Sequence, residues 1–264
     1  MKIKKESLEV HLIQSTPNAE RILSLAKDTR LLGSSDLGPA DRQVDILIRP
    51  FEEVMKNVEY SLDTIGGPLE FIHFIFLVTG ASRSFTHQLV RHRLASFAQQ
   101  SLRVSDNFGY YSPPAIDENL IIKEKYEAWV SKSREMYDYL IDQGIDAQDA
   151  RGVLPIHVTS AILMKVNLRA LIEMIEIRLC LRVQGEHRSF MNKIKNVVID
   201  KYSWLKPKLG PICLAKGICA FQRFDCPISR GVPELKGLSD DKKKIISTIF
   251  EAYGDKGFQP NQPK

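Results

Sequence analysis

A run of basic side chains followed by a Ser-x-Arg segment is the part of the sequence best suited to bind an anion. Arg91-His92-Arg93 close a predicted helix, and seven residues separate them from Ser101, which is followed by Arg103. A serine hydroxyl and nearby backbone N–H groups can surround a phosphate dianion while an arginine neutralises it. The alternative is a solvated basic helix end, which the helix dipole favours.

The charge distribution around this run supports a small anionic ligand. The chain has 37 basic and 32 acidic residues, a net charge of +5, which is weak evidence for nucleic-acid binding over the whole surface. Residues 71–105 contain no Asp or Glu, yet they include Arg83 among their cations. Apolar residues alternate with these cations, so part of the segment should be packed against protein. Partly buried arginines need anionic partners, and a phosphate-bearing ligand would supply them.

A second basic pair lies on the helix expected from Asn167 to about Leu181. At 100° per residue, Arg169 and Arg178 fall on opposite sides of this helix, so they can serve two ligands or two sites more easily than one. The alternative is that both arginines pair with acidic neighbours. The possible acidic partners are Glu173, Glu176 and Glu186. The expected apolar face of the helix consists of Leu168, Leu171, Ile172, Ile175 and Leu179.

The elements that must position these residues indicate a single α+β domain over residues 1–205, with a mixed or antiparallel sheet flanked by helices. Residues 206–264 form a C-terminal extension of unknown role with a short Lys-rich helix near 241–253. Strands are expected over 8–13 and 71–78, extended or mixed structure over 96–104 and 153–164, a loop over 33–40, and helices over 19–27, 51–62, 82–93, 120–142, 167–181 and 186–201. Ser82 and Asn167 are the expected N-caps.

The sequence resembles the flavin-dependent thymidylate synthases. The resemblance begins with Arg91-His92-Arg93, seven residues, Ser101, and covers about residues 8–204. Its further points are Pro68-Leu69-Glu70, Gln88, Arg103, Ala150-Arg151, Leu154-Pro155, Asn167-Leu168-Arg169 and Arg178. The resemblance implies reductive methylation of deoxyuridylate (dUMP) to thymidylate (dTMP), with bound FAD, methylenetetrahydrofolate as the carbon donor and NADPH as the reductant. It also implies a homotetramer whose active sites are shared between subunits.

The resemblance also implies roles for individual residues. The implied FAD contacts are Arg91, His92, Arg93, Gln99, Asn167, Arg169 and Glu173. The implied dUMP contacts are Gln88, Arg91, Gln99, Gln100, Ser101, Leu102, Arg103, Arg151 and Arg178, with Ser101, Arg103 and Arg151 near the phosphate. Arg178 is the implied catalytic residue, because a fixed cation beside the pyrimidine stabilises the anionic form of the uracil ring and so activates carbon 5.

Four positions depart from the family pattern. Ile65 lies in a segment, 64–68, where many relatives have a His. Gln99 stands where an acidic residue is common, and Glu173 where an Asn is often found. The segment 183–188 only partly matches the family's usual Ala-Gln-Trp-Glu run. These changes concern the details of FAD binding more than the reaction.

The cysteines suggest two competing interpretations. A thymidylate synthase of the other type would use a Cys nucleophile such as Cys226. Cys213, Cys219 and Cys226 are separated by five and six residues, which is not a Cys-x-x-Cys zinc knuckle, and no fourth ligand is evident. We expect no bound metal and reduced cytosolic thiols. A basic nucleic-acid-binding module is the remaining alternative.

The sequence predicts a cytoplasmic protein with no nucleic-acid or membrane partner. The longest apolar stretch, 71–78, is interrupted by His73 and is far shorter than the roughly 20 residues of a membrane span. No apolar segment follows the basic N-terminus, so a signal peptide is not expected.

Overall fold

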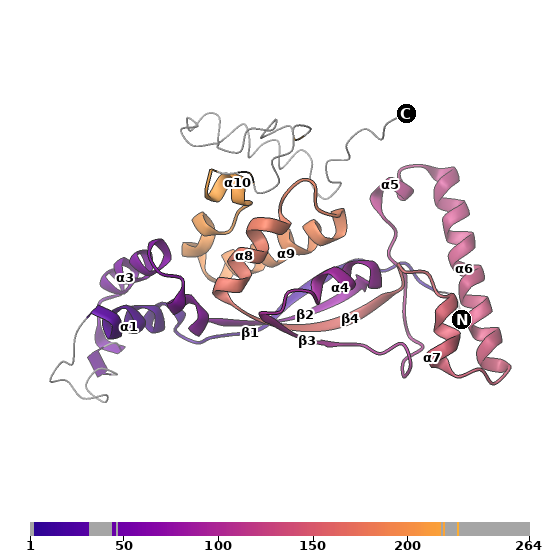
Figure 1. The fold of residues 1–264 in the computed structure, drawn as a ribbon, viewed down its shortest axis with the longest axis horizontal. Coiled ribbons are helices and arrows are strands. Elements are labelled where there is room, and N and C mark those ends of the chain that lie inside the picture. Colours follow the sequence, from indigo (N-terminus) through magenta and orange to yellow (C-terminus); the bar gives the residue numbers. More distant parts are fainter. Residues whose placement is uncertain (1–2, 32–43, 46, 218, 220–225, 227–264) are drawn as a thin grey trace.

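A four-stranded antiparallel sheet forms the centre of the computed structural model, which describes residues 3–31, 44, 45, 47–217, 219 and 226 (Figure 1). The strand order is β1-β2-β4-β3, and each neighbouring pair is antiparallel. The strands are β1 (Glu9–Ser15), β2 (His73–Ser82), β3 (Ala95–Gln99) and β4 (Thr159–Asn167). The α+β class and the antiparallel sheet predicted from the sequence are confirmed.

Helices cover one face of the sheet and extend from both ends of it. In Figure 1, α8 and α9 lie over one face, α1 and α3 lie at one end of the strands, and α6 and α7 lie at the other. The helices are α1 (Ala19–Leu31), α3 (Phe51–Asp63), α4 (Arg83–Leu89), α5 (Pro114–Asp117), α6 (Leu120–Asp142), α7 (Ala147–Ala150), α8 (Leu168–Arg178), α9 (Gly185–Lys201) and α10 (Ile212–Ala215). The described part of the chain also has 3₁₀ segments at Gly67–Phe71, Arg151–Val153 and Ser203–Lys208. None of the described helices is long and apolar enough to cross a bilayer.

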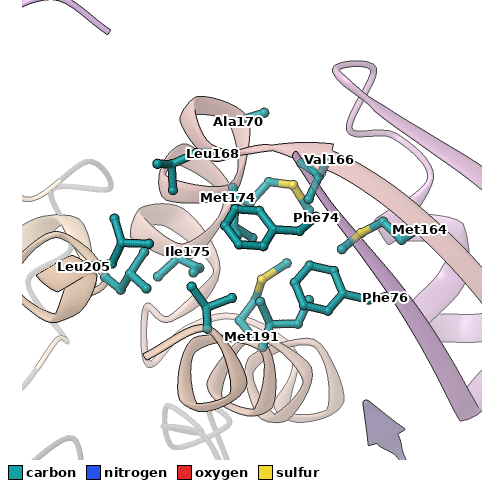
Figure 2. Close-up of a cluster of buried hydrophobic side chains, with 14 of the residues drawn as sticks. Phe74, Phe76, Met164, Val166, Leu168, Ala170, Met174, Ile175, Met191 and Leu205 are labelled. Carbon is teal, nitrogen blue, oxygen red and sulfur yellow. The ribbon is translucent and has the colours of Figure 1, made fainter. Parts of the chain in front are cut away.

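The core fills the space between the sheet and α8 and α9 (Figure 2). Alternate residues of β2 point inward because side chains alternate along a strand, and Phe74 and Phe76 are completely buried. Their rings stack at 6.0 Å between centroids. The apolar face expected for α8 is confirmed, since Leu171 and Ile175 are fully buried against this cluster. The core therefore fixes α8, whose two ends carry the arginines singled out above.

Local capping signals explain where two of these elements start. Ser82 accepts a hydrogen bond from the backbone N–H of Phe85, and Asn167 accepts one from Ala170, so both predicted N-caps are confirmed. The helix expected over 82–93 is too long by four residues, because α4 ends at Leu89. Arg91 lies in a tight turn instead, because the chain must reverse before Ala95 pairs with β4.

Other boundaries differ in the same way. The mixed segment 153–164 divides into a 3₁₀ turn and β4, the extended segment 96–104 remains a strand only to Gln99, and α8 ends at Arg178 instead of at about 181. The loop expected over 33–40, the short helix near 241–253 and most of the C-terminal extension lie outside the described residues.

Candidate functional site

The start of α4 is fixed by a buried carboxylate. Both oxygens of the Glu186 side chain accept hydrogen bonds from Ser82, at 2.8 Å from its backbone nitrogen and 2.5 Å from its hydroxyl. Ser82 in turn caps α4. Since Glu186 belongs to α9, these bonds tie α4 to the core helices, and they thereby hold the basic turn that follows α4.

Burial raises the pKa of Glu186 to about 7 from its usual 4.5, although the bonds from Ser82 oppose this shift. The folded protein therefore binds a proton at Glu186 that the unfolded chain releases between about pH 4.5 and 7. The stability contributed by this proton is complete below the lower pKa and is lost as the pH rises through about 7.

Removing the titratable group should therefore flatten the pH dependence of stability. Between about pH 5 and pH 8, the free energy of unfolding of the wild-type protein should fall by about 1 to 3 kcal/mol more than that of Glu186→Gln. This range follows from the shift in the pKa of Glu186, because one pKa unit corresponds to about 1.36 kcal/mol. Urea unfolding of both proteins at several pH values measures this difference. Identical pH profiles would show that Glu186 does not titrate in this range.

A first positive cluster forms where the basic turn meets the end of α8. Arg178 donates a hydrogen bond from Nε to Nε2 of His92, at 3.2 Å. Burial, together with the charge of Arg178, lowers the pKa of His92 to about 4, so the imidazole is neutral at pH 7. Because Nε2 accepts the bond from Arg178, the proton of His92 resides on Nδ1. Burial lowers the pKa of Arg178, and the positive charge of Arg91 is a second, smaller cause of this shift.

Arg178 is a half-buried cation without a carboxylate partner among the described residues. The acidic neighbours considered from the sequence are engaged elsewhere: Glu176 pairs with Lys216, and Glu186 bonds Ser82. An arginine held in this way, beside a second arginine, favours an anionic ligand, because a buried charge is costly unless it is neutralised. The alternative of a structural ion pair is therefore wrong for Arg178 within the described part of the chain.

His187 supports this cluster from behind. It is completely buried, and neither ring nitrogen has a hydrogen-bond partner among the described residues. Its ring meets Phe85 edge-on at 5.0 Å and His92 at 6.1 Å between centroids. Burial lowers its pKa to about 3, with Arg178 and His92 contributing. His187 is thus a neutral residue that packs against Phe85 and His92; in the sequence it lies in the segment 183–188, which only partly matches the family pattern.

A cavity of about 330 Å³ opens between the basic turn and α8. The turn contributes its cations, whereas α8 contributes a mostly apolar wall. The lining residues are Arg91, His92, Arg93, Leu94, Ala95, Ala170, Glu173, Met174 and Ile177. Such a surface suits a ligand that combines a flat apolar group with an anionic group.

Arg169 lies near the start of α8, whereas Arg178 is the last residue of that helix. Arg169 forms ion pairs with Glu70 at 2.8 Å and with Glu173 at 3.4 Å. The pairing expected as an alternative for Arg169 is therefore present, but both Glu carboxylates and the guanidinium are about half exposed. Arg169 partly compensates the charge of Glu173 beside the cavity.

A second positive cluster lies at the N-terminal end of α4. Arg83 donates a hydrogen bond from Nη2 to the backbone oxygen of Gln100 at 2.6 Å, while its Nε has no hydrogen-bond partner among the described residues. Burial lowers the pKa of Arg83, and the charge of Arg151 lowers it further. Two close arginines again lack a described carboxylate partner. Arg83 was noticed in the sequence only as one of the cations of an acid-free segment.

The predicted phosphate turn follows β3 directly. The Ser101 hydroxyl accepts a hydrogen bond from the Arg103 backbone N–H at 3.2 Å, and the Arg103 side chain is exposed. Leu102 is 6% exposed and packs with Phe108 in a small second core. The Leu102 side chain thus anchors the turn, and only its backbone is available to a ligand.

The three glutamines are held by neighbouring side chains. Gln88 donates a hydrogen bond to Gln184. The amide nitrogen of Gln99 donates to Thr86 and Ser160, each at 2.9 Å. The side chain of Gln100 accepts a hydrogen bond from the backbone N–H of Ala161 in β4 and donates one to Ser105, in the loop after β3. Among the predicted residues, Arg91, His92 and Arg178 lie together in the first cluster, and Arg151 lies near Arg83 in the second. No hydrogen bond or ion pair among the described residues joins Arg178 to the 101–103 turn.

Comparison with known proteins gives consistent matches over this region. The family model described as "Thymidylate synthase complementing protein" matches residues 11–202. A flavin-dependent thymidylate synthase of Nitratidesulfovibrio vulgaris is 36% identical, over 63% of this chain and 74% of its own. One of Clostridium tetani is 30% identical, over 86% and 96%. A UMP/dUMP methylase from Streptomyces cacaoi, solved with 5-Br dUMP, shares the fold, with a TM-score of 0.62 at 21% identity over 80% of this chain and 94% of that one.

Proposed function

Because the chain belongs to the family of thymidylate synthase complementing proteins, we propose that it converts dUMP to dTMP by flavin-dependent reductive methylation. The observation that carries the proposal is the half-buried Arg178, bonded to a neutral His92 and left without a described carboxylate partner. A guanidinium keeps its charge throughout a reaction, so Arg178 can stabilise the anionic uracil ring without losing its proton.

The cavity residues fit one part of an FAD molecule. Arg91 and Arg93 can neutralise a pyrophosphate, and the α8 wall around Met174 can pack against a flat ring. When bound, FAD would supply the hydride that completes the methyl group. A cavity of about 330 Å³ is too small to enclose a whole dinucleotide, so the remainder would lie outside it.

The further FAD contacts proposed from the sequence fit less uniformly. The Asn167 side chain already caps α8, and Arg169 is paired with Glu173. Gln99 faces Thr86 and Ser160. We therefore assign Arg91, His92 and Arg93 as the principal flavin contacts, with Arg169 offsetting the charge of Glu173.

The second positive cluster fits the nucleotide phosphate. Arg151 and the 101–103 turn offer cations and a hydroxyl, and Arg83 reinforces the positive potential. Gln88 lies near the basic turn, where its side-chain amide can form hydrogen bonds with the polar edge of the uracil ring. No hydrogen bond or ion pair joins the two clusters in the part of the chain that the structure describes, and the proposal therefore includes a homotetramer with sites shared between subunits. Methylenetetrahydrofolate would provide the carbon and NADPH the electrons, in the cytoplasm.

A Cys nucleophile is disfavoured by burial. Burial raises the pKa of the Cys213 thiol to about 12, and Cys226 is only 9% exposed. A thiol with a raised pKa is a poor nucleophile, and a buried thiol is poorly accessible to a substrate. The flavin route requires no covalent bond to the enzyme.

The proposal predicts a yellow protein with a specific nucleotide requirement. Purified protein should release flavin on denaturation, and with NADPH and methylenetetrahydrofolate it should form dTMP from dUMP. Chromatographic separation of the nucleotides, combined with an absorbance spectrum, measures both. A colourless protein that binds generic DNA with strong salt dependence would instead support the nucleic-acid alternative.

A further inference from the structure

A small second core supports the residues assigned to the phosphate. Its buried members come from the loop after β3, from α6, from α7 and from the segment before β4, and they are Leu102, Phe108, Tyr137, Ala150 and Val158. Leu102 directly precedes Arg103, and Ala150 directly precedes Arg151. Each of these two arginines is therefore one residue away from a side chain that packs in the same core.

Arg134, on α6, packs against this core as a buried cation. Its side chain is only 8% exposed. The guanidinium lies 4.7 Å from the ring centroid of Phe108 and 5.4 Å from that of Tyr137, and these two rings meet edge-on at 5.7 Å between centroids. Asp138, one turn later on α6, accepts a hydrogen bond from Arg134 Nε at 2.9 Å. The buried charge is thus neutralised within its own helix.

A further bond of Arg134 reaches the loop that carries the phosphate turn. Its Nη1 donates to the backbone oxygen of Asp106, at 2.8 Å, and Asp106 is three residues beyond Arg103. A guanidinium holds its donors in one rigid plane. The ring contacts and the ion pair with Asp138 therefore fix the direction of the bond to Asp106, and this bond ties the loop to α6.

The same loop is closed on itself by Gln100. The side-chain oxygen of Gln100 accepts a hydrogen bond from the backbone N–H of Ala161 in β4, at 2.9 Å. Its amide nitrogen donates to Ser105 and to the backbone oxygen of Asn107, each at 3.0 Å. Gln100 thus holds the loop against the sheet, while Arg134 holds it against α6.

A buried arginine can also serve only as packing, because its stem is apolar. An apolar side chain of similar length would fill the same space without the cost of burying a charge, but it could not bond the loop. The position of that bond, three residues after Arg103, points to a role in placing the turn.

We propose that Arg134 is a positioning residue for the phosphate of dUMP, which holds the 101–106 loop so that Arg103 faces the anion. Arg134 does not itself touch the nucleotide, because its side chain is buried against Phe108 and Tyr137. This inference rests on the proposed function, since it takes the phosphate to bind at Arg103.

Arg134→Met tests the proposal, because methionine keeps an unbranched stem against the rings and removes the bond to Asp106. The Kd of dUMP should rise about 10-fold, within the roughly 10- to 150-fold range of one charge-assisted contact. The affinity for deoxyuridine and the flavin absorbance should not change. Lys132→Ala, an exposed position on the same helix, is the matched control and should bind dUMP as the wild type does.

Arg134→Lys provides the same test if methionine at this position prevents folding. Lysine keeps the charge beside Asp138 but lacks the planar donors, so the Kd of dUMP should lie between those of the wild type and Arg134→Met.

A double variant separates positioning from a general structural role. If Arg134 acts through Arg103, the Arg134→Met change should raise the Kd of dUMP by less than about threefold when Arg103 is already Ala, because coupled residues are not additive. A residue that only stabilises the fold would have the same effect with and without Arg103. Calorimetric titration of the four proteins gives this comparison.

Hydrogen exchange tests the position of the loop without any ligand. The backbone N–H of Ser105 donates to the Ser101 oxygen at 3.1 Å, and a peptide covering 101–107 should exchange about tenfold faster in Arg134→Met. A peptide covering β2 should exchange as in the wild type.

Three results would each overturn the role of Arg134 alone. They are unchanged dUMP affinity with unchanged exchange of the loop, equal weakening of dUMP and deoxyuridine, and an effect of the same size in the Arg103→Ala background. A folded wild-type protein that binds no dUMP would instead overturn the proposed function, and the inference with it.

Discussion

Arg178→Ala is expected to lose methyl transfer while the protein stays yellow. If the guanidinium stabilises the anionic uracil, its removal should slow the chemical step by about 10²- to 10³-fold, as the loss of one preorganised electrostatic group typically does. The flavin should remain bound because Arg91 and Arg93 are intact. Stopped-flow oxidation of pre-reduced flavin by dUMP and methylenetetrahydrofolate measures this step.

Two comparisons make the Arg178 experiment specific. Arg178→Lys keeps a positive charge but loses the Nε bond to His92, so it should recover only part of the rate. Arg169→Ala, at the other end of α8, should lose flavin affinity first, and excess FAD should restore part of its activity. Near-normal turnover in Arg178→Ala, or equal flavin loss in both alanine variants, would contradict the division of roles.

Arg103→Ala is expected to weaken dUMP binding while flavin remains bound. A charge-assisted hydrogen bond contributes about 1.5 to 3 kcal/mol, which corresponds to a roughly 10- to 150-fold rise in Kd. Ser101→Ala should have a smaller effect in the same direction, because it removes a neutral hydroxyl. Calorimetric titration gives both affinities.

Deoxyuridine, which lacks the phosphate, provides the control for this prediction. The Arg103→Ala and wild-type proteins should bind deoxyuridine equally, because the lost contact is to the phosphate alone. If Arg103→Ala weakens the binding of deoxyuridine as much as the binding of dUMP, Arg103 stabilises the structure of the turn and does not contact the phosphate. Unchanged dUMP affinity in both Arg103→Ala and Ser101→Ala would contradict the assignment of these two residues to the phosphate.

Local patterns in the sequence predict most of the fold. The period of β2 and the apolar face of α8 follow from burial of one side of each element, and Ser82 and Asn167 mark helix starts through their own hydrogen bonds. The end of α4 is different. Its position depends on where Ala95 joins the sheet, and that pairing partner is about 70 residues away in sequence.

The contacts that support the candidate site are similarly non-local. The bond between Ser82 and Glu186 joins residues 104 apart, and the position of His187 behind His92 depends on how α9 packs on α4. Motif spacing predicted the arginines of the candidate site, but it could not predict the buried residues that pack behind them.

An anaerobic single-turnover experiment tests the central claim most directly. Protein with pre-reduced flavin is mixed with dUMP and methylenetetrahydrofolate, without NADPH, and both flavin absorbance and nucleotides are followed. We predict one dTMP for each flavin oxidised, with both processes at the same rate. Formation of dTMP without flavin oxidation, or flavin oxidation that does not depend on dUMP and yields no dTMP, would contradict the account.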